Sequence, residues 1–331
     1  MRSARLQLAL DSGAWTLPAT GKIAVYRPRL GDDLSALPRN RVVVVTGFKP
    51  DHDHFARMYP VTPDAPYAAA LVCLPRSRDG ARALLAQAAD EVVPGGPIAV
   101  DGQKTDGIDT ALKDLRGRVS VSESLSKAHG KLATFAAGPE LRDWRAAMRK
   151  VDGGFLTLPG IFSADAPDPG SVLLARALPP DLGGKIADLG AGWGFLAREI
   201  LTRPKVRQLD LVEAEADALT SAQANVIDDR ARFHWADAIQ WRPESLLDAV
   251  VMNPPFHAGR AADPALGAAF IQTARRMLAP NGSLWLVANR HLPYDAVLTD
   301  AFLEHKEVTG TSAFRVIHAT KPRFQPARAK P

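Results

Sequence analysis

Short apolar runs and amphipathic segments alternate along the second half of the chain, from about residue 185. The apolar runs are only a few residues long, which predicts buried strands. The segments between them carry apolar residues at helical spacing, such as Leu266, Phe270 and Ala274. This alternation predicts a parallel sheet with helices on both faces. The predicted strands are 185–190, 208–214, 232–237, 247–252 and 283–289, and the predicted helices are 195–201, 216–226 and 263–279.

Two further features complete the pattern of the second half. The tripeptide PNG at 280–282 is a strong turn signal in front of the last of these strands. Residues 307–320 predict a closing pair of antiparallel strands. We therefore expect an α/β fold in which helices flank a seven-stranded mixed sheet.

The first half contains a weaker copy of this pattern. The order of the copy and its approximate spacing agree with the second half, which predicts duplication of one α/β unit. Chance similarity between two α/β domains is the alternative. We place the boundary between a first domain, 1–150, and a second domain, 151–331. The matching segments are ALVCLPRS (70–77) with AVVMNPPFH (249–257), 86–102 with 274–289, and KLATFAA (131–137) with FRVIHAT (314–320).

The first copy lacks the polar residues of the second. It reads LPRS at 74–77 where the second copy reads NPPF at 253–256. Residues 41–52 are the nearest first-half candidate for a nucleotide-binding loop, and they hold one glycine where the second half has three. We therefore expect any chemistry of this chain to lie in the second domain.

Charge is distributed unevenly along the chain. Residues 1–150 hold 22 Lys and Arg against 16 Asp and Glu, whereas residues 151–312 hold 14 against 20. Residues 313–331 hold five basic residues and no acidic one. A basic first half and a basic tail indicate an anionic macromolecular partner, nucleic acid first. A solvated surface with a disordered tail is the alternative.

Other composition features exclude several classes of protein. The single cysteine, Cys73, excludes an internal disulfide framework and fits a reducing cytoplasm. The N-terminal residues MRSARLQLAL mix polar with apolar positions and match neither a signal peptide nor a membrane span. The histidines show no metal-ligand spacing, and no phosphate-binding G-x-x-x-x-G-K is present. We expect a cytoplasmic monomer without a metal and without a membrane partner.

A glycine-rich turn follows the first strand of the second domain and opens a helix. Asp188 precedes Gly190, Gly192 and Gly194. Glycines at such a turn allow unusual backbone dihedrals and let a ligand approach the backbone amides. A dinucleotide loop of the form G-x-G-x-x-G would need a small residue at position 195, which is Phe195. The spacing disfavours NAD and resembles the D-x-G-x-G-x-G loop of class I S-adenosylmethionine-dependent methyltransferases.

Two acids follow the next two strands. Glu213 ends the second predicted strand, where a carboxylate can accept hydrogen bonds from both hydroxyls of a ribose. Asp237 ends the third, where it can accept from an adenine amino group. Parallel strands bring their carboxyl ends to one edge of the sheet, so these acids and the glycine turn outline one crevice. Asp188 is expected to support the turn or a methionine ammonium.

The fourth strand runs into Asn253, Pro254, Pro255 and Phe256. Prolines cannot donate to a sheet, so the strand stops at Asn253. The Asn253 side-chain oxygen and the Pro254 carbonyl can accept both hydrogens of an exocyclic amino group. At about 1.5–3 kcal/mol per charge-assisted bond, two acceptors supply about two to four orders of magnitude in rate. The Phe256 ring offers a surface on which a base stacks.

These residues resemble the Asn/Asp/Ser-Pro-Pro-Tyr/Phe motif of amino-directed methyltransferases. Three segments narrow the resemblance to bacterial ribosomal RNA guanine-N2 methyltransferases of the RsmC type, which have a "methyltransferase small" domain. The match extends over nearly all of 158–320. The segments are LPGIFSADAPDPGSVLLARAL (158–178), NPPFHAG (253–259) and LVANRHLPY (286–294).

The resemblance implies two tandem Rossmann-like methyltransferase domains, of which the N-terminal one is degenerate and binds RNA. It implies S-adenosylmethionine as cofactor and ribosomal RNA or a ribosomal subunit, most directly the small one, as partner. Phe162 and Ser163 resemble the family's segment near the donor site, although a role in packing is equally open. For His257 we expect a structural role. The implied catalytic residues are Asn253, Pro254, Pro255 and Phe256. The implied cofactor-binding residues are Asp188, Gly190, Ala191, Gly192, Gly194, Glu213, Ala214, Asp237, Ala238 and Asn253.

Other functions remain open at the level of sequence. The motif at Asn253 also fits an adenine N6 amine in nucleic acid or a glutamine side-chain amide in a protein, because each presents an NH₂ group beside a π system. A hypothesis from a different class of function is an RNA-binding assembly factor with a vestigial donor site. A nicotinamide dehydrogenase is disfavoured by Phe195 and leaves the Asn-Pro-Pro segment unexplained.

Overall fold

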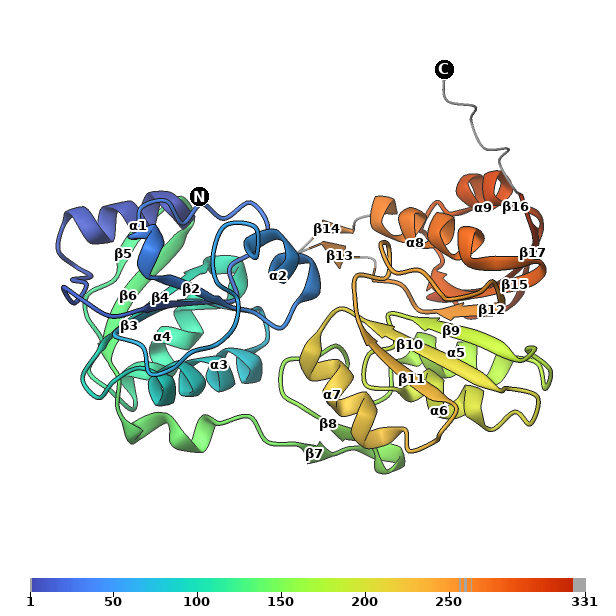
Figure 1. The fold of residues 1–331 in the computed structure, drawn as a ribbon, viewed down its shortest axis with the longest axis horizontal. Coiled ribbons are helices and arrows are strands. Elements are labelled where there is room, and N and C mark those ends of the chain that lie inside the picture. Colours follow the sequence, from blue (N-terminus) through green and yellow to red (C-terminus); the bar gives the residue numbers. More distant parts are fainter. Residues whose placement is uncertain (1, 256, 259–260, 263, 324–331) are drawn as a thin grey trace, which may run out of the picture. The chain divides into compact units, whose positions relative to one another are not determined.

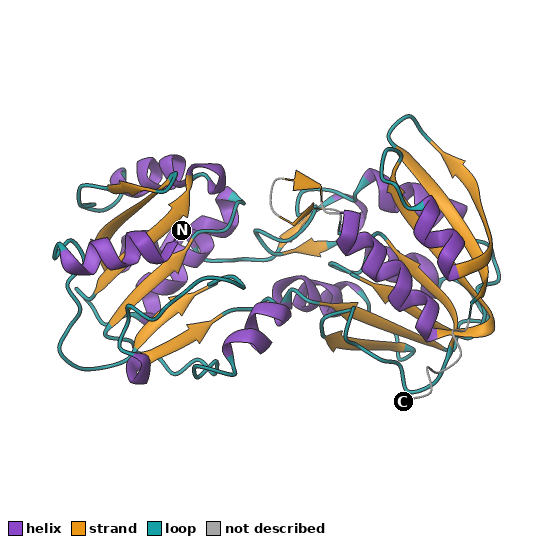
Figure 2. Cartoon of the chain, turned by 90° about the horizontal axis from the view of Figure 1, so that it is seen from above, coloured by secondary structure: helices purple, strands orange, loops and turns teal. Residues whose placement is uncertain are grey.

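The computed structural model describes residues 2–255, 257–258, 261–262 and 264–323. The chain forms two compact units (Figure 1). Unit 1 comprises Met1–Met148 and Leu158–Ile161, and unit 2 comprises Arg149–Thr157 and Phe162–Pro331. Each unit is built around its own sheet, with helices on both sides of it (Figure 2).

Unit 2 contains a seven-stranded sheet within the described residues. The strand order is β11-β10-β9-β12-β15-β17-β16. The first five strands run parallel, and β17 pairs antiparallel with both β15 and β16. The central strands are buried apolar runs, as expected for parallel strands covered on both faces. The strands are β9 (Lys185–Leu189), β10 (Gln208–Glu213), β11 (Ala231–Trp235), β12 (Leu247–Met252), β15 (Leu278–Asn289), β16 (Phe302–Gly310) and β17 (Phe314–Pro322).

Helices cover both faces of the unit 2 sheet. One face packs against apolar side chains of α5, α6 and α7, such as Leu174, Ile200 and Ala222. The other face packs against α8 and α9 through Ile271 and Leu298. The helices are α5 (Pro169–Ala177), α6 (Phe195–Leu201), α7 (Ala216–Asn225), α8 (Pro264–Met277) and α9 (Asp295–Ala301). Shorter elements are η4 (Asp152–Gly154) and the two-residue strands β7 (Arg149–Lys150), β8 (Leu156–Thr157), β13 (His257–Ala258) and β14 (Ala261–Ala262).

The order and type of the predicted elements of unit 2 are confirmed. The predicted helix 195–201 and strand 247–252 coincide with α6 and β12. The strand start predicted after the PNG turn, at residue 283, is wrong, because β15 already begins at Leu278. Leu247 pairs with Leu278 and Ala249 pairs with Ser283, so the PNG segment forms an irregularity inside the strand.

Unit 1 contains a six-stranded sheet in the part of the chain that the structure describes, where the resemblance implied seven strands. Its order is β2-β1-β3-β4-β6-β5, in which β2, β1, β3 and β4 run parallel and β6 pairs antiparallel with both β4 and β5. The strands are β1 (Ile23–Tyr26), β2 (Val42–Val45), β3 (Ala69–Cys73), β4 (Pro97–Gln103), β5 (Leu125–Lys127) and β6 (Gly130–Ala136). The helices are α1 (Arg2–Asp11), α2 (Lys49–Phe55), α3 (Arg78–Glu91), α4 (Ile108–Arg116), η1 (Arg39–Arg41), η2 (Lys104–Asp106) and η3 (Pro139–Trp144).

The two sheets share the order of their strands, except that unit 1 lacks a counterpart of β11 among its described residues. Strand β3 lies between β1 and β4 as β12 lies between β9 and β15, which fits the internal repeat expected from the sequence. In the unit 1 sheet, β1 takes the position that β9 has in the unit 2 sheet. Residues 27–31 follow β1, as the glycine turn follows β9. Residues 41–52, the nearest first-half candidate for a nucleotide-binding loop, contain the edge strand β2 and the start of α2, so they do not follow the strand that corresponds to β9.

A buried ion pair connects helix α1 to the sheet of unit 1. The guanidinium of Arg5 donates from Nε and Nη2 to the carboxylate of Asp101, at 2.6 and 3.0 Å. Both side chains are fully buried. Arg2 approaches the same carboxylate at 3.3 Å. Removing one partner of a buried pair leaves the other charge without compensation, which destabilises more than loss of an exposed pair.

We predict that Arg5→Ala lowers the free energy of unfolding of unit 1 by about 3 kcal/mol, because Asp101 then stays buried without its bidentate partner and keeps only the longer contact with Arg2. Urea unfolding of the purified protein measures this change. The matched control is Arg232→Ala, which removes an exposed ion pair with Glu244 and should change stability little. Equal losses for the two variants would contradict this account.

Candidate active site

The glycine turn after β9 adopts backbone angles that favour glycine. Gly190, Gly192 and Gly194 have φ values of 74°, 55° and 88°. A Cβ atom at Gly194 would lie 2.9 Å from Cγ2 of Val226, so this position also needs the missing side chain for packing. At Gly192 nothing lies within 4 Å of such an atom. The turn is therefore closely packed where α6 begins and open at Gly192, where a ligand can approach the backbone.

Asp188 lies inside β9, one residue before the strand ends. Its side chain is fully buried, and neither carboxylate oxygen has a hydrogen-bond partner among the described residues. Burial, with the nearby charge of Glu213, raises the pKa of Asp188 to about 8. A buried carboxyl group without a partner is unusual in a folded core and marks a candidate functional site.

Glu213 is the last residue of β10, as predicted, and its carboxylate holds the glycine turn. Oε2 accepts a hydrogen bond from the Gly192 amide and Oε1 accepts one from the Glu215 amide, each at 2.8 Å. Desolvation raises the pKa of Glu213, and these backbone hydrogen bonds oppose the rise. Each oxygen still has a second lone pair with which to accept a further hydrogen bond.

The third predicted acid lies in a loop rather than at a strand end. Strand β11 stops at Trp235, and Asp237 follows two residues later. Its carboxylate accepts hydrogen bonds from the Ile239 amide at 2.9 Å and from the Gln240 side chain at 3.0 Å. The indole of Trp235 donates to the carbonyl of Ala214 at 2.9 Å, which ties this loop to the residue after Glu213. Of the neighbouring predicted residues, Ala191 and Ala238 are buried.

Asn253 follows the last residue of β12, at the same edge of the sheet as the glycine turn. Met252 pairs with Leu189, so Asn253 and Gly190 leave adjacent strands at neighbouring positions. Pro254 is buried and Pro255 is exposed. The remaining motif residue, Phe256, lies outside the described residues, and so does the side chain predicted at His257.

Two residues at the start of α5, Asp168 and Ser171, hold the Asn253 amide. Neither was predicted from the sequence to have a role. Nδ2 of Asn253 donates to Oδ2 of Asp168 and to Oγ of Ser171, both at 2.8 Å. Asp168 caps α5 and accepts from the Ser171 amide at 2.8 Å. The sequence did carry the signal of this cap, since Asp-Pro-Gly-Ser is typical of a helix start with proline at the first position.

The glycine turn is also tied to the segment in front of α5. The buried indole of Trp193 donates to the carbonyl of Phe162 at 3.1 Å, whereas the Phe162 side chain is 60% exposed. The Asn225 amide donates to the carbonyls of Leu156 and Trp193, both at 2.8 Å. The structure therefore places Phe162 beside the turn without burying its ring, and Trp193 is a core residue.

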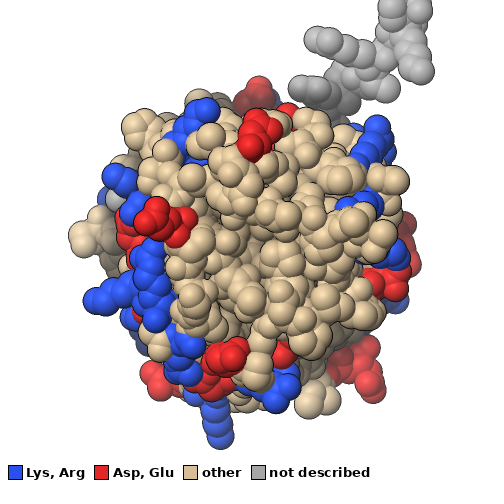
Figure 3. Space-filling model, turned by 90° about the vertical axis from the view of Figure 1, so that its left-hand side faces the viewer, with Lys and Arg blue, Asp and Glu red and all other residues tan. Residues whose placement is uncertain are grey.

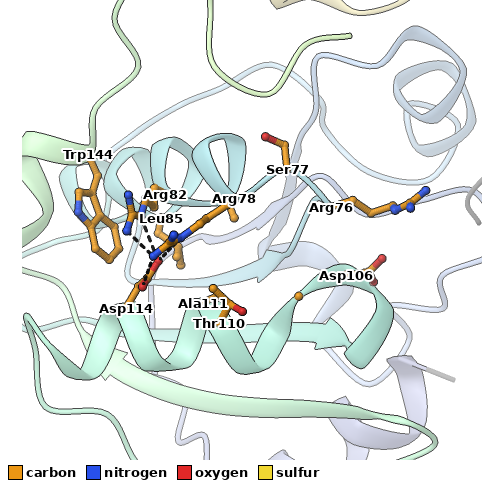
Figure 4. A pocket seen from close by; sticks show the side chains of 12 residues that line it. Arg76, Ser77, Arg78, Arg82, Leu85, Asp106, Thr110, Ala111, Asp114 and Trp144 are labelled. Atoms are coloured by element: carbon orange, nitrogen blue, oxygen red, sulfur yellow. Dashed lines mark hydrogen bonds and ion pairs between the residues drawn. The ribbon is translucent and has the colours of Figure 1, made fainter. Parts of the chain in front are cut away.

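Unit 1 has a pocket of its own between α3 and α4, with a volume of about 240 Å³ (Figure 4). Arg78 and Arg82 reach across it from α3 and both bind Asp114 of α4, at 2.8 and 3.0 Å. The Arg82 guanidinium also lies over the Trp144 ring, 5.3 Å from its centre. These charges cross-link the walls of the pocket. Arg76, from the LPRS segment, lines its rim.

Among the described residues, no helix is long and apolar enough to cross a bilayer. No group of three or more His, Cys, Asp and Glu side chains gathers in a way that would hold a metal ion within the same ranges.

Comparison with known proteins identifies the family. The model of the methyltransferase small domain matches residues 152–318. The "Ribosomal RNA small subunit methyltransferase C" of Pseudomonas paraeruginosa is 33% identical over 78% of this chain and 81% of its own length. The protein of the same name from Shewanella loihica is 29% identical over 75% of each chain.

A solved structure extends the likeness to both units. It is titled "T. Thermophilus 16S rRNA N2 G1207 methyltransferase (RsmC) in complex with AdoMet and Guanosine". The match has a TM-score of 0.78 with 24% identity and covers 97% of this chain and 91% of the other. The fold is that of a class I methyltransferase. The chain belongs to the methyltransferase small domain family, within the group of ribosomal RNA small subunit methyltransferases C.

We predict that Asp188→Asn stabilises the protein increasingly as the pH rises from about 4 to about 8. The unfolded Asp ionises near pH 4, whereas the folded carboxyl group keeps its proton up to about pH 8. Between these pH values the unfolded wild-type chain binds fewer protons than the folded chain. The free energy of unfolding of the wild type therefore falls as the pH rises. At about 1.4 kcal/mol per pKa unit, the full difference is on the order of 5 kcal/mol.

Thermal unfolding of the variant and the wild type between pH 4 and 9 measures this effect. The difference in Tm should be smallest near pH 4 and level off above pH 8. The pH dependence is the signature, because any constant offset also contains the cost of burying the new amide. A difference that does not change with pH would show that Asp188 is ionised in the folded protein at neutral pH.

Proposed function

We propose that this protein transfers a methyl group from S-adenosylmethionine to the exocyclic N2 amine of a guanine in small-subunit ribosomal RNA. The main observation behind this proposal is that the Asn-Pro-Pro segment follows β12 at the edge of the sheet where the glycine turn follows β9. Support comes from relatives named for the small-subunit rRNA and from the solved relative, whose title names an N2 guanine target, AdoMet and guanosine.

The residues at the strand ends fit the donor. The oxygens of Asp188, unpaired within the described ranges, suit the ammonium of a methionine moiety, because a cation supplies a partner there. Gly192 leaves its backbone open to a ligand, and the free lone pairs of Glu213 suit ribose hydroxyls. Asp237 and Ala238 follow β11, where we place the adenine. S-adenosylmethionine supplies an electrophilic methyl group when it is bound there.

The residues at the end of β12 suit an amine as acceptor. A guanine amine is a poor nucleophile, because its lone pair is delocalised into the ring. The Asn253 oxygen and the Pro254 carbonyl accept its two hydrogens and stabilise the positive charge that develops as the nitrogen takes the methyl group. The rigid Pro254 and Pro255 hold these acceptors in place before substrate binds. The product loses its proton to water, and Phe256 provides the stacking surface.

The RNA is held by phosphate contacts outside this site, for which the basic composition of the first half is the main support. On the face of unit 1 drawn in Figure 3, Lys and Arg side chains lie toward the edge, several of them beside Asp or Glu, and few charges occupy the centre. We therefore place the phosphate contacts of unit 1 away from the centre of this face. The target base must leave its stack to reach Asn253, at a cost of a few kcal/mol.

We predict that Asn253→Ala lowers the rate of rRNA methylation by about 10- to 100-fold, because one of the two amine acceptors is lost. Transfer of a radioactive methyl group to small-subunit RNA or to the small subunit, both from a strain lacking the enzyme, measures the rate. The matched control is Asn281→Ala, an exposed asparagine in the irregular part of β15, which should retain wild-type activity.

Three outcomes would overturn the proposal in distinct ways. An undiminished rate for Asn253→Ala would remove the motif from the reaction. Absence of S-adenosylmethionine binding by calorimetry would favour an RNA-binding factor with a vestigial donor site. Methylation of an adenine or of a glutamine amide, with the guanines unchanged by mass spectrometry, would keep the chemistry and change the acceptor.

A further inference from the structure

We propose that Asp168 and Ser171 are positioning residues that fix the orientation of the Asn253 amide. This inference rests on the proposed function, in which the Asn253 oxygen accepts a hydrogen bond from the substrate amine. It adds to that function the reason why the oxygen, rather than the NH₂ group, faces the substrate.

The chemistry of the contacts decides the orientation of the amide. Nδ2 of Asn253 lies 2.8 Å from Oδ2 of Asp168 and 2.8 Å from Oγ of Ser171. An ionised carboxylate can only accept hydrogen bonds, so it selects the NH₂ end of the amide. Both hydrogens of Nδ2 are then used, and Oδ1 points away from α5. A reversed amide would set its oxygen against the carboxylate and present a donor to an amine that is itself a donor.

The two residues are held rigidly by the start of α5. Asp168 caps the helix, and its Oδ2 accepts from the Ser171 amide at 2.8 Å while it also accepts from Asn253. Gly170 allows this turn to pack closely, since a Cβ atom there would lie 3.2 Å from the Phe314 ring. Ser171 is buried, and Leu174, one turn further along α5, is fully buried in the core of unit 2. The support behind Asn253 is therefore part of the folded scaffold.

The same contacts strengthen Asn253 as an acceptor. An amide that donates to a carboxylate is polarised, which increases the negative charge on its oxygen. The negative charge of Asp168 lies behind the amide, on the side opposite to the substrate. Both effects favour the positive charge that develops on the attacking nitrogen, so they lower the barrier for methyl transfer rather than improve binding of the neutral amine.

The decisive variant is Asp168→Asn, which keeps a good helix cap but replaces the carboxylate by a neutral amide. We expect kcat to fall about tenfold, with the KM for RNA and the Kd for S-adenosylmethionine unchanged within about twofold. Asp168→Ala should lower kcat further, by about 100-fold, and Ser171→Ala by about threefold to tenfold, since one of two hydrogen bonds is lost. Thermal unfolding of each variant checks that the fold is retained.

The matched control is Ser77→Ala, which removes the cap of α3 in unit 1, where the side chain accepts from the Gly80 amide at 3.2 Å. It should lower Tm as a lost cap does and leave kcat unchanged. A second control is the pair Asp168→Asn with Asn253→Ala. If Asp168 acts through Asn253, the double variant should be no slower than Asn253→Ala alone.

The outcomes separate this inference from the proposed function. Wild-type kcat for Asp168→Asn, together with a slow Asn253→Ala, would overturn the inference and leave the function standing. A raised Kd for S-adenosylmethionine with unchanged kcat would make Asp168 a donor-binding residue and also overturn the inference. Independent, multiplying losses in the double variant would do the same.

Discussion

The parallel pairing of β9 with β12 is the constraint on which the rest of the site depends. Leu189 lies opposite Met252, so Gly190 and Asn253 are the next residues to leave the sheet, at the same edge. On the other side of β9, Val212 pairs with Leu189 and brings Glu213 to that edge. The paired residues are buried and apolar, and a slip of register by one residue would move each side chain to the opposite face of the sheet, where other helices pack. Core packing therefore sets the spacing between the donor and acceptor groups.

This arrangement carries a cost in stability at one position. Asp188 lies within the packed strand β9, and its carboxyl group has no partner among the described residues. An apolar residue there would suit the core better, by the ordinary rules of burial. A chain tolerates such a group where a ligand compensates it, and the open backbone at Gly192 lies close by along the same turn. The local weakness and the proposed donor site thus have one physical origin.

Sequence patterns predicted the elements of unit 2 because its strands are short apolar runs and its helices are amphipathic. They misplaced the start of β15, since the PNG segment is accommodated as an irregularity within the strand. They also offered 41–52 as the nearest first-half candidate for a nucleotide-binding loop, although this segment contains the edge strand β2, because strand order in a sheet cannot be read from chain order. The roles of Asp168 and Ser171 were missed for a related reason. Their contact with Asn253 joins residues more than 80 positions apart, and no local pattern reports it.

The two units put helices of different chemistry against comparable parts of their sheets. In unit 2, α5 packs on β15 and β17, and its first turn supports Asn253 through Asp168. In unit 1, α1 packs on β5 and β6, and its first turn carries arginines, of which Arg5 neutralises the buried Asp101. The same fold therefore uses the start of a helix in one unit to orient an acceptor and in the other to close an internal ion pair. The strand order that the two units share thus does not depend on the chemistry at the start of these helices.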